Sequence, residues 1–235
     1  MTRIAAVGDV HMDFDVLGRF RPALENLHEH ADMLLLAGDL TRHGTAQEAR
    51  CVAEEFGGLR VPVIAILGNH DYHSDHEVTV TRILCEAGIH VLEGDATVVD
   101  CQGVPVGIAG AKGFGGGFAG RCASAFGEPQ MKAFVEHTEA SAERLSRALK
   151  EVDTECKIAL THYSPVPETL LGEPLEIYPF LGSYLLAEAI DRGGATLAIH
   201  GHAHHGSPRG TTPGGVRVRN VAHPVIRQAY SVFSL

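Results

Sequence analysis

The chain has 235 residues, of which 45% are hydrophobic and 20% are charged. This length and apolar content allow one sizeable core and exclude wholesale disorder. The formal net charge of -10, without a basic stripe, disfavours a nucleic-acid partner and favours a small-molecule substrate.

The cysteines and the apolar stretches indicate the compartment. The five cysteines are odd in number, widely spaced and without a C-x-x-C motif, so we expect a reduced chain. An apolar strand-like run starts at residue 3 without the pattern of a signal peptide. No apolar stretch reaches the ~18 residues of a membrane span. We therefore expect a cytoplasmic protein without a membrane partner.

The first ninety residues repeat one pattern three times. Short apolar runs at 4–7, 33–37 and 61–67 each end in a polar motif that begins with glycine. Helical patterns follow them, at 16–30, 45–56 and 75–87. Continuous apolar runs that alternate with helices predict βαβ units and a parallel sheet.

The second half has a different character. Residues 91–110 predict three short strands, 129–152 and 183–192 predict helices, and 156–160 and 196–199 predict strands. Two antiparallel strands are expected near 216–221 and 226–233. The glycine-rich stretch 111–127 predicts a mobile loop, and prolines make 163–182 an irregular connection. No linker or repeat is visible, so we expect a single domain over 1–235.

Polar side chains follow successive predicted strands, where open α/β sheets place their sites. They are Asp9, His11, Asp39, Asn69, His70, Asp71, His162, His202 and His204. In extended backbone, residues two apart point the same way, so Asp9 and His11 could face one ion together, and so could His202 and His204. Taken singly, each motif is commonly a turn, a helix cap or a packed histidine. Their joint occurrence at strand ends favours a metal site.

The candidate ligands are all nitrogen and oxygen donors. Such a set suits manganese, iron, zinc, cobalt, nickel or magnesium better than an iron–sulfur cluster. Adjacent Asn69 and His70 would point apart, so one of them could be a ligand while the other faces a substrate. With Asp71 left aside, seven candidate ligands remain, more than one tetrahedral zinc needs, so we expect two divalent ions that share a carboxylate. Asp39, the second acidic residue in order, is the natural bridge. We expect the neighbouring His200 and His205 to be non-ligands.

The ordered motifs D-x-H, G-D, G-N-H-D, H and G-H-x-H, from Asp9 to His204, resemble the calcineurin-like metallophosphoesterase superfamily. The resemblance implies an α/β fold, a four-layer α/β/β/α sandwich of two mixed β-sheets. It also implies one ion held by Asp9, His11, Asp39 and His204, and another held by Asp39, Asn69, His162 and His202. His70 would be the acid that is not a ligand, with Asp71 positioning it.

The expected activity is hydrolysis of small phosphomono- or phosphodiesters by a hydroxide that bridges the metals, with His70 protonating the leaving oxygen. A cyclic-nucleotide phosphodiesterase or a nuclease with the same site is an alternative, as is a non-catalytic metal-binding scaffold. A scaffold would be free to lose His70 and several ligands, and here the whole set is present. Residues 111–127 and 163–181 are expected to line the rim of the site and set specificity. The sequence leaves the oligomeric state open.

Overall fold

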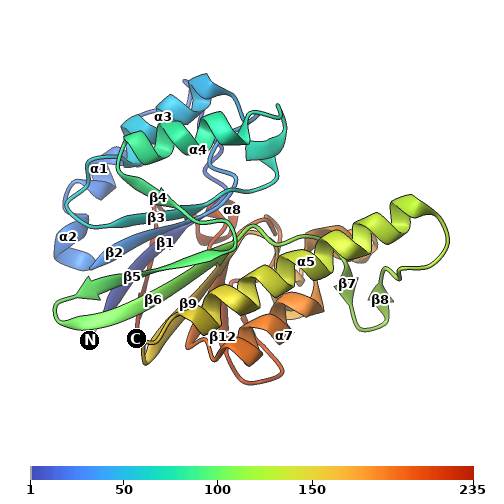
Figure 1. Ribbon diagram of the computed structural model, residues 1–235. Coiled ribbons are helices and arrows are strands. Elements are labelled where there is room, and N and C mark those ends of the chain that lie inside the picture. The colour runs from blue at the N-terminus through green and yellow to red at the C-terminus, as the bar shows by residue number, and fades with distance from the viewer. Residues whose placement is uncertain (1) are drawn as a thin grey trace.

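The computed structural model describes residues 2–235 and contains two large β-sheets (Figure 1). The first sheet has the strand order β13-β1-β2-β3-β4. Its strands are β1 (Arg3–Val7), β2 (Met33–Ala37), β3 (Val63–Ile66), β4 (Ile89–Val91) and β13 (Ser231–Ser234). β1 to β4 run parallel and β13 is antiparallel to β1. The parallel sheet predicted for the first ninety residues is confirmed.

The second sheet has the order β11-β12-β10-β9-β6-β5. Its strands are β5 (Asp95–Cys101), β6 (Val104–Ala111), β9 (Cys156–Thr161), β10 (Leu197–His200), β11 (Arg209–Thr211) and β12 (Arg217–Asn220). The four central strands are parallel, and the edge strands β5 and β11 are antiparallel to their neighbours. Both sheets are therefore mixed.

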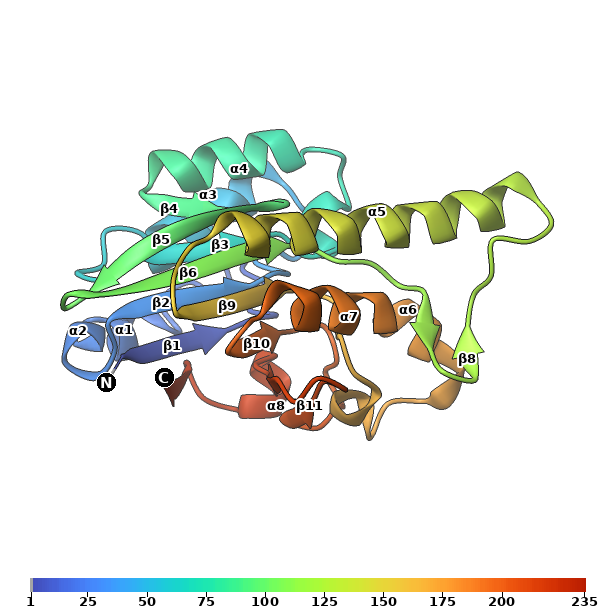
Figure 2. The same cartoon turned by 60° about the horizontal axis from the view of Figure 1, so that its bottom comes forward.

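Helices cover the outer face of each sheet (Figures 1 and 2). The first sheet carries α1 (Arg21–Leu24), α2 (Leu27–His30), α3 (Ala46–Phe56) and α4 (Glu77–Glu86). The second carries α5 (Pro129–Glu151) and α7 (Tyr184–Gly193). The expected four-layer α/β/β/α sandwich is confirmed. None of the helices within residues 2–235 has both the length and the apolar character that a bilayer crossing requires.

The strand sequences explain the layers, because successive side chains of a strand point to opposite faces. In β1, Ile4 and Ala6 pack between the sheets, whereas Ala5 and Val7 pack under the helices. Both faces are buried, so the run is continuously apolar. In β9, Ala159 lies on the helix side, where a small side chain lets the helices approach the sheet.

One long helix was predicted over 16–30, and this is wrong. The chain forms two single-turn helices, α1 and α2, instead. The carboxylate of Glu55 accepts hydrogen bonds from the backbone N–H groups of Gly18, Phe20 and Arg21. Because the Glu55 side chain of α3 takes these N–H donors, the chain before α1 is held as a loop. The periodicity of the sequence carries no sign of this distant acceptor.

The predicted antiparallel pair at the end of the chain is also wrong. β12 belongs to the second sheet and β13 to the first, and α8 (His223–Ile226) separates them. Val221 accepts a hydrogen bond from Gly8 N–H, and His223 N–H donates to Gly8 O. These hydrogen bonds direct the chain from β12 in the second sheet to the end of β1 in the first sheet. The short strand β11 was not predicted.

Only the first part of the segment 111–127, which was predicted as a mobile loop, is packed in place: residues 111–118 are buried or half-buried, and most of residues 119–127 are exposed. It contains the hairpin of β7 (Gly117–Phe118) and β8 (Arg121–Cys122). Gly116 N–H donates to Pro179 O and Gly117 N–H donates to Gly182 O. The proline-rich connection holds three short helices, which are η2 (Pro167–Leu170), η3 (Leu175–Ile177) and α6 (Tyr178–Leu181). The two segments therefore pack against each other.

Candidate metal centre and catalytic site

The polar motifs that follow five strands meet at one edge of the sandwich. Asp9 follows β1, Asp39 follows β2 and Asn69 follows β3 in the first sheet. His162 follows β9, and His202 and His204 follow β10, in the second sheet. Parallel strands bring their carboxyl ends to the same edge, so residues far apart in sequence come together.

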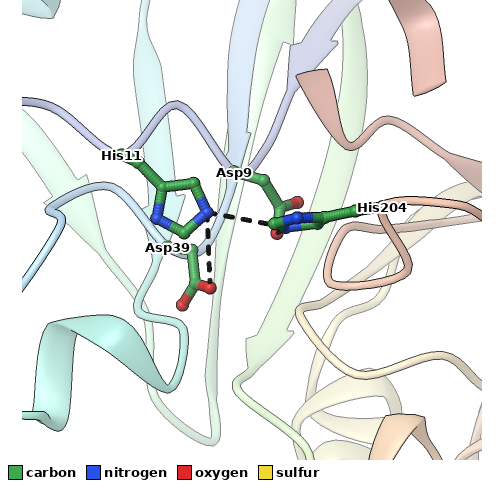
Figure 3. A group of neighbouring side chains, drawn as sticks. All are labelled: Asp9, His11, Asp39 and His204. Atoms are coloured by element: carbon green, nitrogen blue, oxygen red, sulfur yellow. Dashed lines mark hydrogen bonds and ion pairs between the residues drawn. The ribbon is translucent and has the colours of Figure 1, made fainter. Parts of the chain in front are cut away.

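The first cluster consists of Asp9, His11, Asp39 and His204 (Figure 3). One ligand atom from each lies within 4.8 Å of all the others. His204 Nε2 is 2.9 Å from Asp9 Oδ1, and His11 Nε2 is 3.5 Å from His204 Nε2. His11 Nε2 is also 3.9 Å from Asp39 Oδ2. These nitrogen and oxygen atoms face a common point from three loops, those after β1, β2 and β10.

The second cluster consists of Asp39, His162 and His202, again with ligand atoms within 4.8 Å of one another. The Oδ1 atom of Asn69 joins it, 3.0 Å from His162 Nε2. His162 Nε2 is 3.3 Å from Asp39 Oδ1. Asp39 therefore belongs to both clusters, with each carboxylate oxygen turned to different histidines.

Hydrogen bonds to backbone carbonyls fix which ring nitrogen of His162 and of His202 can bind a metal. His162 Nδ1 lies 2.9 Å from Ala37 O, and His202 Nε2 lies 3.2 Å from Phe180 O. A carbonyl oxygen only accepts, so each of these nitrogens carries the proton. The lone pair is left on Nε2 of His162 and on Nδ1 of His202. Metal-binding histidines are oriented in this way.

This tautomer provides a test of whether a cation fits the second cluster. With its proton on Nδ1, neutral His162 turns an Nε2 lone pair toward the Asp39 and Asn69 oxygens. Three acceptor atoms then face one another with no donor between them. Such an arrangement is unfavourable unless a proton or a metal ion lies among them. Nitrogen and oxygen donors of this kind suit a divalent metal ion.

The electrostatics of the metal-free site also favour a positive charge in the second cluster. Burial opposes protonation of His162, but the Asp39 carboxylate outweighs burial and raises the pKa of His162 to about 9. Burial likewise favours neutral Asp39, yet the attraction of His162 holds the pKa of that carboxyl well below its usual range. A proton on His162 Nε2 thus occupies the place that a cation would take.

Four of the clustered residues have unusual backbone conformations. The φ angles of Asp9, His11, Asp39 and His202 are 56°, 44°, 48° and 69°. Residues with a side chain disfavour this left-handed region by ~1–2 kcal/mol each. The backbone is therefore not extended here, and the period-two argument for His202 and His204 is wrong: these two side chains lie in different clusters.

Two glycines allow the carboxylates to reach their positions. A Cβ atom on Gly68 would collide with the backbone nitrogen and Oδ1 of Asp39. One on Gly201 would collide with Oδ2 of Asp9. The absence of a side chain at these positions lets neighbouring strand-end loops pack directly against the candidate ligands.

His70 lies at the rim of the first cluster. Its Nδ1 donates to Arg42 O at 2.7 Å, and its Nε2 is 3.9 Å from Asp39 Oδ2. Its ring meets that of His11 edge to face, with centroids 4.5 Å apart. The hydrogen bond from Nδ1 turns Nε2 toward the first cluster. There Nε2 can exchange a proton with a small molecule bound at the site.

Asp71 was expected to position His70, and the structure turns its side chain to other groups. Its buried carboxylate accepts hydrogen bonds from Leu40 N, Thr41 N, Thr41 Oγ1 and Gly68 N. Burial and the charge of Asp39 raise the pKa of Asp71 to about 6. The side chain ties the loop after β2 to the loop after β3. The orientation of the His70 ring depends on the Arg42 carbonyl instead.

The remaining histidines of the last motif lie outside both clusters. Buried His200 contacts Gly201 O and Thr169 Oγ1, at 2.7 Å and 2.9 Å. His205 is exposed. The carbonyls of Ala37, Arg42 and Phe180 were missed by the sequence analysis, because backbone acceptors carry no sequence signal.

Comparison with known proteins places these observations in a family. The sequence pattern of the family described as calcineurin-like phosphoesterase matches residues 2–206. A probable cyclic nucleotide phosphodiesterase from Xenorhabdus bovienii (strain SS-2004) is 29% identical over 70 residues. That match covers 30% of this chain and 28% of the relative.

Solved structures show the same fold at low identity. Phosphopantetheinyl hydrolase from Mycobacterium tuberculosis has a TM-score of 0.68 at 17% identity, over 96% of this chain and 90% of that one. A putative 5'-nucleotidase from Staphylococcus aureus has a TM-score of 0.58 at 16% identity, over 93% of this chain and 48% of that one. Identity this low establishes a shared fold alone.

Proposed function

Because this chain belongs to the calcineurin-like phosphoesterase family, we propose that it is a metal-dependent phosphoric ester hydrolase with a dinuclear centre. Asp9, His11, Asp39 and His204 would hold one divalent ion. Asp39, Asn69, His162 and His202 would hold the other. The substrates would be small phosphomono- or phosphodiesters. The observation that carries the proposal is the shared position of Asp39, whose two oxygens face histidines of both clusters.

The protein residues have distinct tasks in this proposal. Two bound divalent ions would supply Lewis acidity toward phosphoryl oxygens and lower the pKa of the attacking water. The Arg42 carbonyl keeps one proton on His70 Nδ1. When His70 is doubly protonated, Nε2 carries the second proton and can donate it to the leaving oxygen. The ring then returns to the neutral tautomer that Arg42 already favours.

The acid role of His70 is tested by varying the leaving group. His70→Ala should reduce kcat/KM for alkyl phosphate esters by ~100-fold or more, because an alkoxide needs a proton to depart. Nitrophenyl esters, whose leaving group is stable as an anion, should lose far less. A panel of mono- and diesters with manganese, iron, zinc, magnesium, cobalt or nickel would measure both effects.

Two controls make this test decisive. Metal content should be the same in wild type and His70→Ala, measured by elemental analysis after gel filtration. His73→Ala, an exposed neighbour, should retain the activity on alkyl esters. An equal loss for both kinds of leaving group would remove the acid role from His70. A wild type that hydrolyses no ester with any of the metals would remove the proposed activity.

A second candidate is a cyclic-nucleotide phosphodiesterase with the same site. The partial likeness to the Xenorhabdus relative favours it. Hydrolysis of cyclic AMP and cyclic GMP beside linear diesters would decide between this candidate and a general phosphoesterase.

We also propose that residues 1–235 form one domain, since both sheets share the buried layer between them. The five free thiols support a cytoplasmic location for the protein.

A further inference from the structure

The ammonium group of Lys112, directly after β6, is surrounded by aromatic rings. Its Nζ atom lies 4.9 Å from the centre of the Tyr72 ring, 5.2 Å from that of Phe114 and 5.4 Å from that of Tyr163. The residue is only 9% exposed. Aromatic faces attract a cation but accept no strong hydrogen bond, so the three N–H donors are left without acceptors.

Within residues 2–235, the Lys112 ammonium has neither a hydrogen bond nor an ion pair. The nearby Glu93 carboxylate is already engaged, since it accepts from Lys112 backbone N–H at 3.2 Å and pairs with Arg144 at 3.5 Å. Burial lowers the pKa of Lys112, and the charge of Glu93 opposes this effect. A largely buried cation that has no protein partner, and that solvent still reaches, makes an anionic ligand favourable here.

The rings around this ammonium also border the candidate metal centre. Tyr163 packs on His202, with ring centroids 4.4 Å apart, and on His162, at 5.6 Å. The backbone N–H groups of His162 and Tyr163 both donate to Lys112 O. Tyr72 lies two residues after His70. Lys112 is therefore built into the wall of the second cluster.

Other cations close to the site have partners. Arg42 pairs with Asp13 and Asp15, and Arg144 pairs with Glu93. Lys112 differs from both because its charge is uncompensated by a direct contact. The hydroxyl of Tyr163, whose ring centre lies 5.4 Å from Lys112 Nζ, also has no hydrogen bond within the described residues.

We propose that Lys112 binds a second anionic group of the substrate, a phosphate or carboxylate that lies beyond the scissile phosphate. The inference rests on the proposed function and narrows its substrates to esters that carry two anionic groups. The lysine stem is flexible, so its ammonium can reach a ligand as a compact point charge. The aromatic rings hold the ammonium group at the edge of the site before a substrate binds. The Tyr163 hydroxyl can donate a second hydrogen bond to the anionic group.

The test uses alkyl nitrophenyl phosphates of increasing chain length that end in a methyl group or a second phosphate. With manganese, wild type should prefer the phosphate-ended member of the best pair by about tenfold or more in kcat/KM. Lys112→Met should reduce that preference at least about tenfold, and Lys112→Arg should keep most of it. The preference is the ratio of kcat/KM for the phosphate-ended and the methyl-ended substrate, measured with the same variant. Differences in folding or metal loading between variants therefore cancel. Lys150→Met, at the exposed end of α5, is the matched control.

Binding of the corresponding alkyl phosphates and alkyl bisphosphates, measured by calorimetry, does not require turnover. Equal preference in wild type and Lys112→Met, in both turnover and binding, would overturn the role of Lys112 and leave the phosphoesterase activity standing. A binding preference that depends on Lys112, in a wild type that hydrolyses no ester, would support the anion site and remove the proposed activity.

Discussion

The end of β2 holds both ring nitrogens of His162, a residue from the other sheet. Ala37 O, at the last residue of β2, accepts the Nδ1 proton at 2.9 Å. Asp39, two residues further on, places Oδ1 3.3 Å from Nε2. One sheet thus determines the orientation and the charge of a histidine that the other sheet supplies.

Asp39→Asn should remove both metal ions, because Asp39 is the residue that the two clusters share. An amide is a much weaker ligand than a carboxylate and also removes the charge that offsets the cations. His204→Asn, which alters one cluster, should leave one ion bound more tightly than the other. Elemental analysis after gel filtration measures the ratio of metal to protein, with Asp153→Asn, at an exposed position, as control. Two ions retained in Asp39→Asn would contradict a bridging role.

Metal affinity should rise with pH, because a cation must displace the proton of His162. The pKa of this residue is raised to about 9 in the metal-free chain. Below that value we expect a gain of about tenfold in affinity per pH unit. The same shift stabilises the metal-free fold, fully below the ordinary histidine value and less as pH rises through about 9.

Calorimetry with manganese, in buffers of different ionisation enthalpy, would count the protons released on binding. His90→Gln, at an exposed position of β4, should release as many protons as wild type. Affinity that is constant between about pH 6 and 8 would show that His162 carries no proton for the metal to displace.

Gly68→Ala should displace the Asp39 carboxylate and weaken metal binding. The new Cβ would meet the backbone nitrogen and Oδ1 of Asp39, neither of which can move freely. We expect a loss of roughly 2 kcal/mol in the free energy of unfolding, as for other overpacked sites. Denaturant unfolding and metal analysis check both effects. Gly88→Ala has open space around the new Cβ but a left-handed φ of 82°, so it should lose stability and still keep its metal. Equal metal affinity in both variants would contradict the steric argument.

Asp71→Asn should destabilise the fold although aspartate and asparagine side chains have the same shape. The carboxylate accepts from four donors on the loops after β2 and β3. An amide would turn its own N–H₂ toward some of them, at a cost of about 2–4 kcal/mol. Thermal and urea unfolding measure the loss, with exposed Asp75→Asn as control. If Asp71→Asn unfolds like wild type, this carboxylate does not hold the loops together.

Parts of the fold were readable from sequence because they depend on local pattern. The buried runs of β1, β2 and β3 alternate between two apolar faces, and this is visible as continuous hydrophobicity. The segment 16–30 was misread because Glu55 of α3 takes its backbone donors. The last two strands were misassigned because bonds to Gly8 send the chain to the other sheet. Both errors come from contacts between residues distant in sequence.

The sequence by itself determined which donor groups stand at the strand ends, since Asp9, Asp39, His162 and His204 each follow an apolar run. Tertiary structure alone decided how they are used. Asp39 is shared because strands of both sheets end around it, and the free nitrogen of His162 is set by the Ala37 carbonyl. Left-handed backbone angles, rather than strand alternation, aim the Asp9 and His202 side chains. Such relations depend on the packing of two sheets, which no spacing of residues encodes.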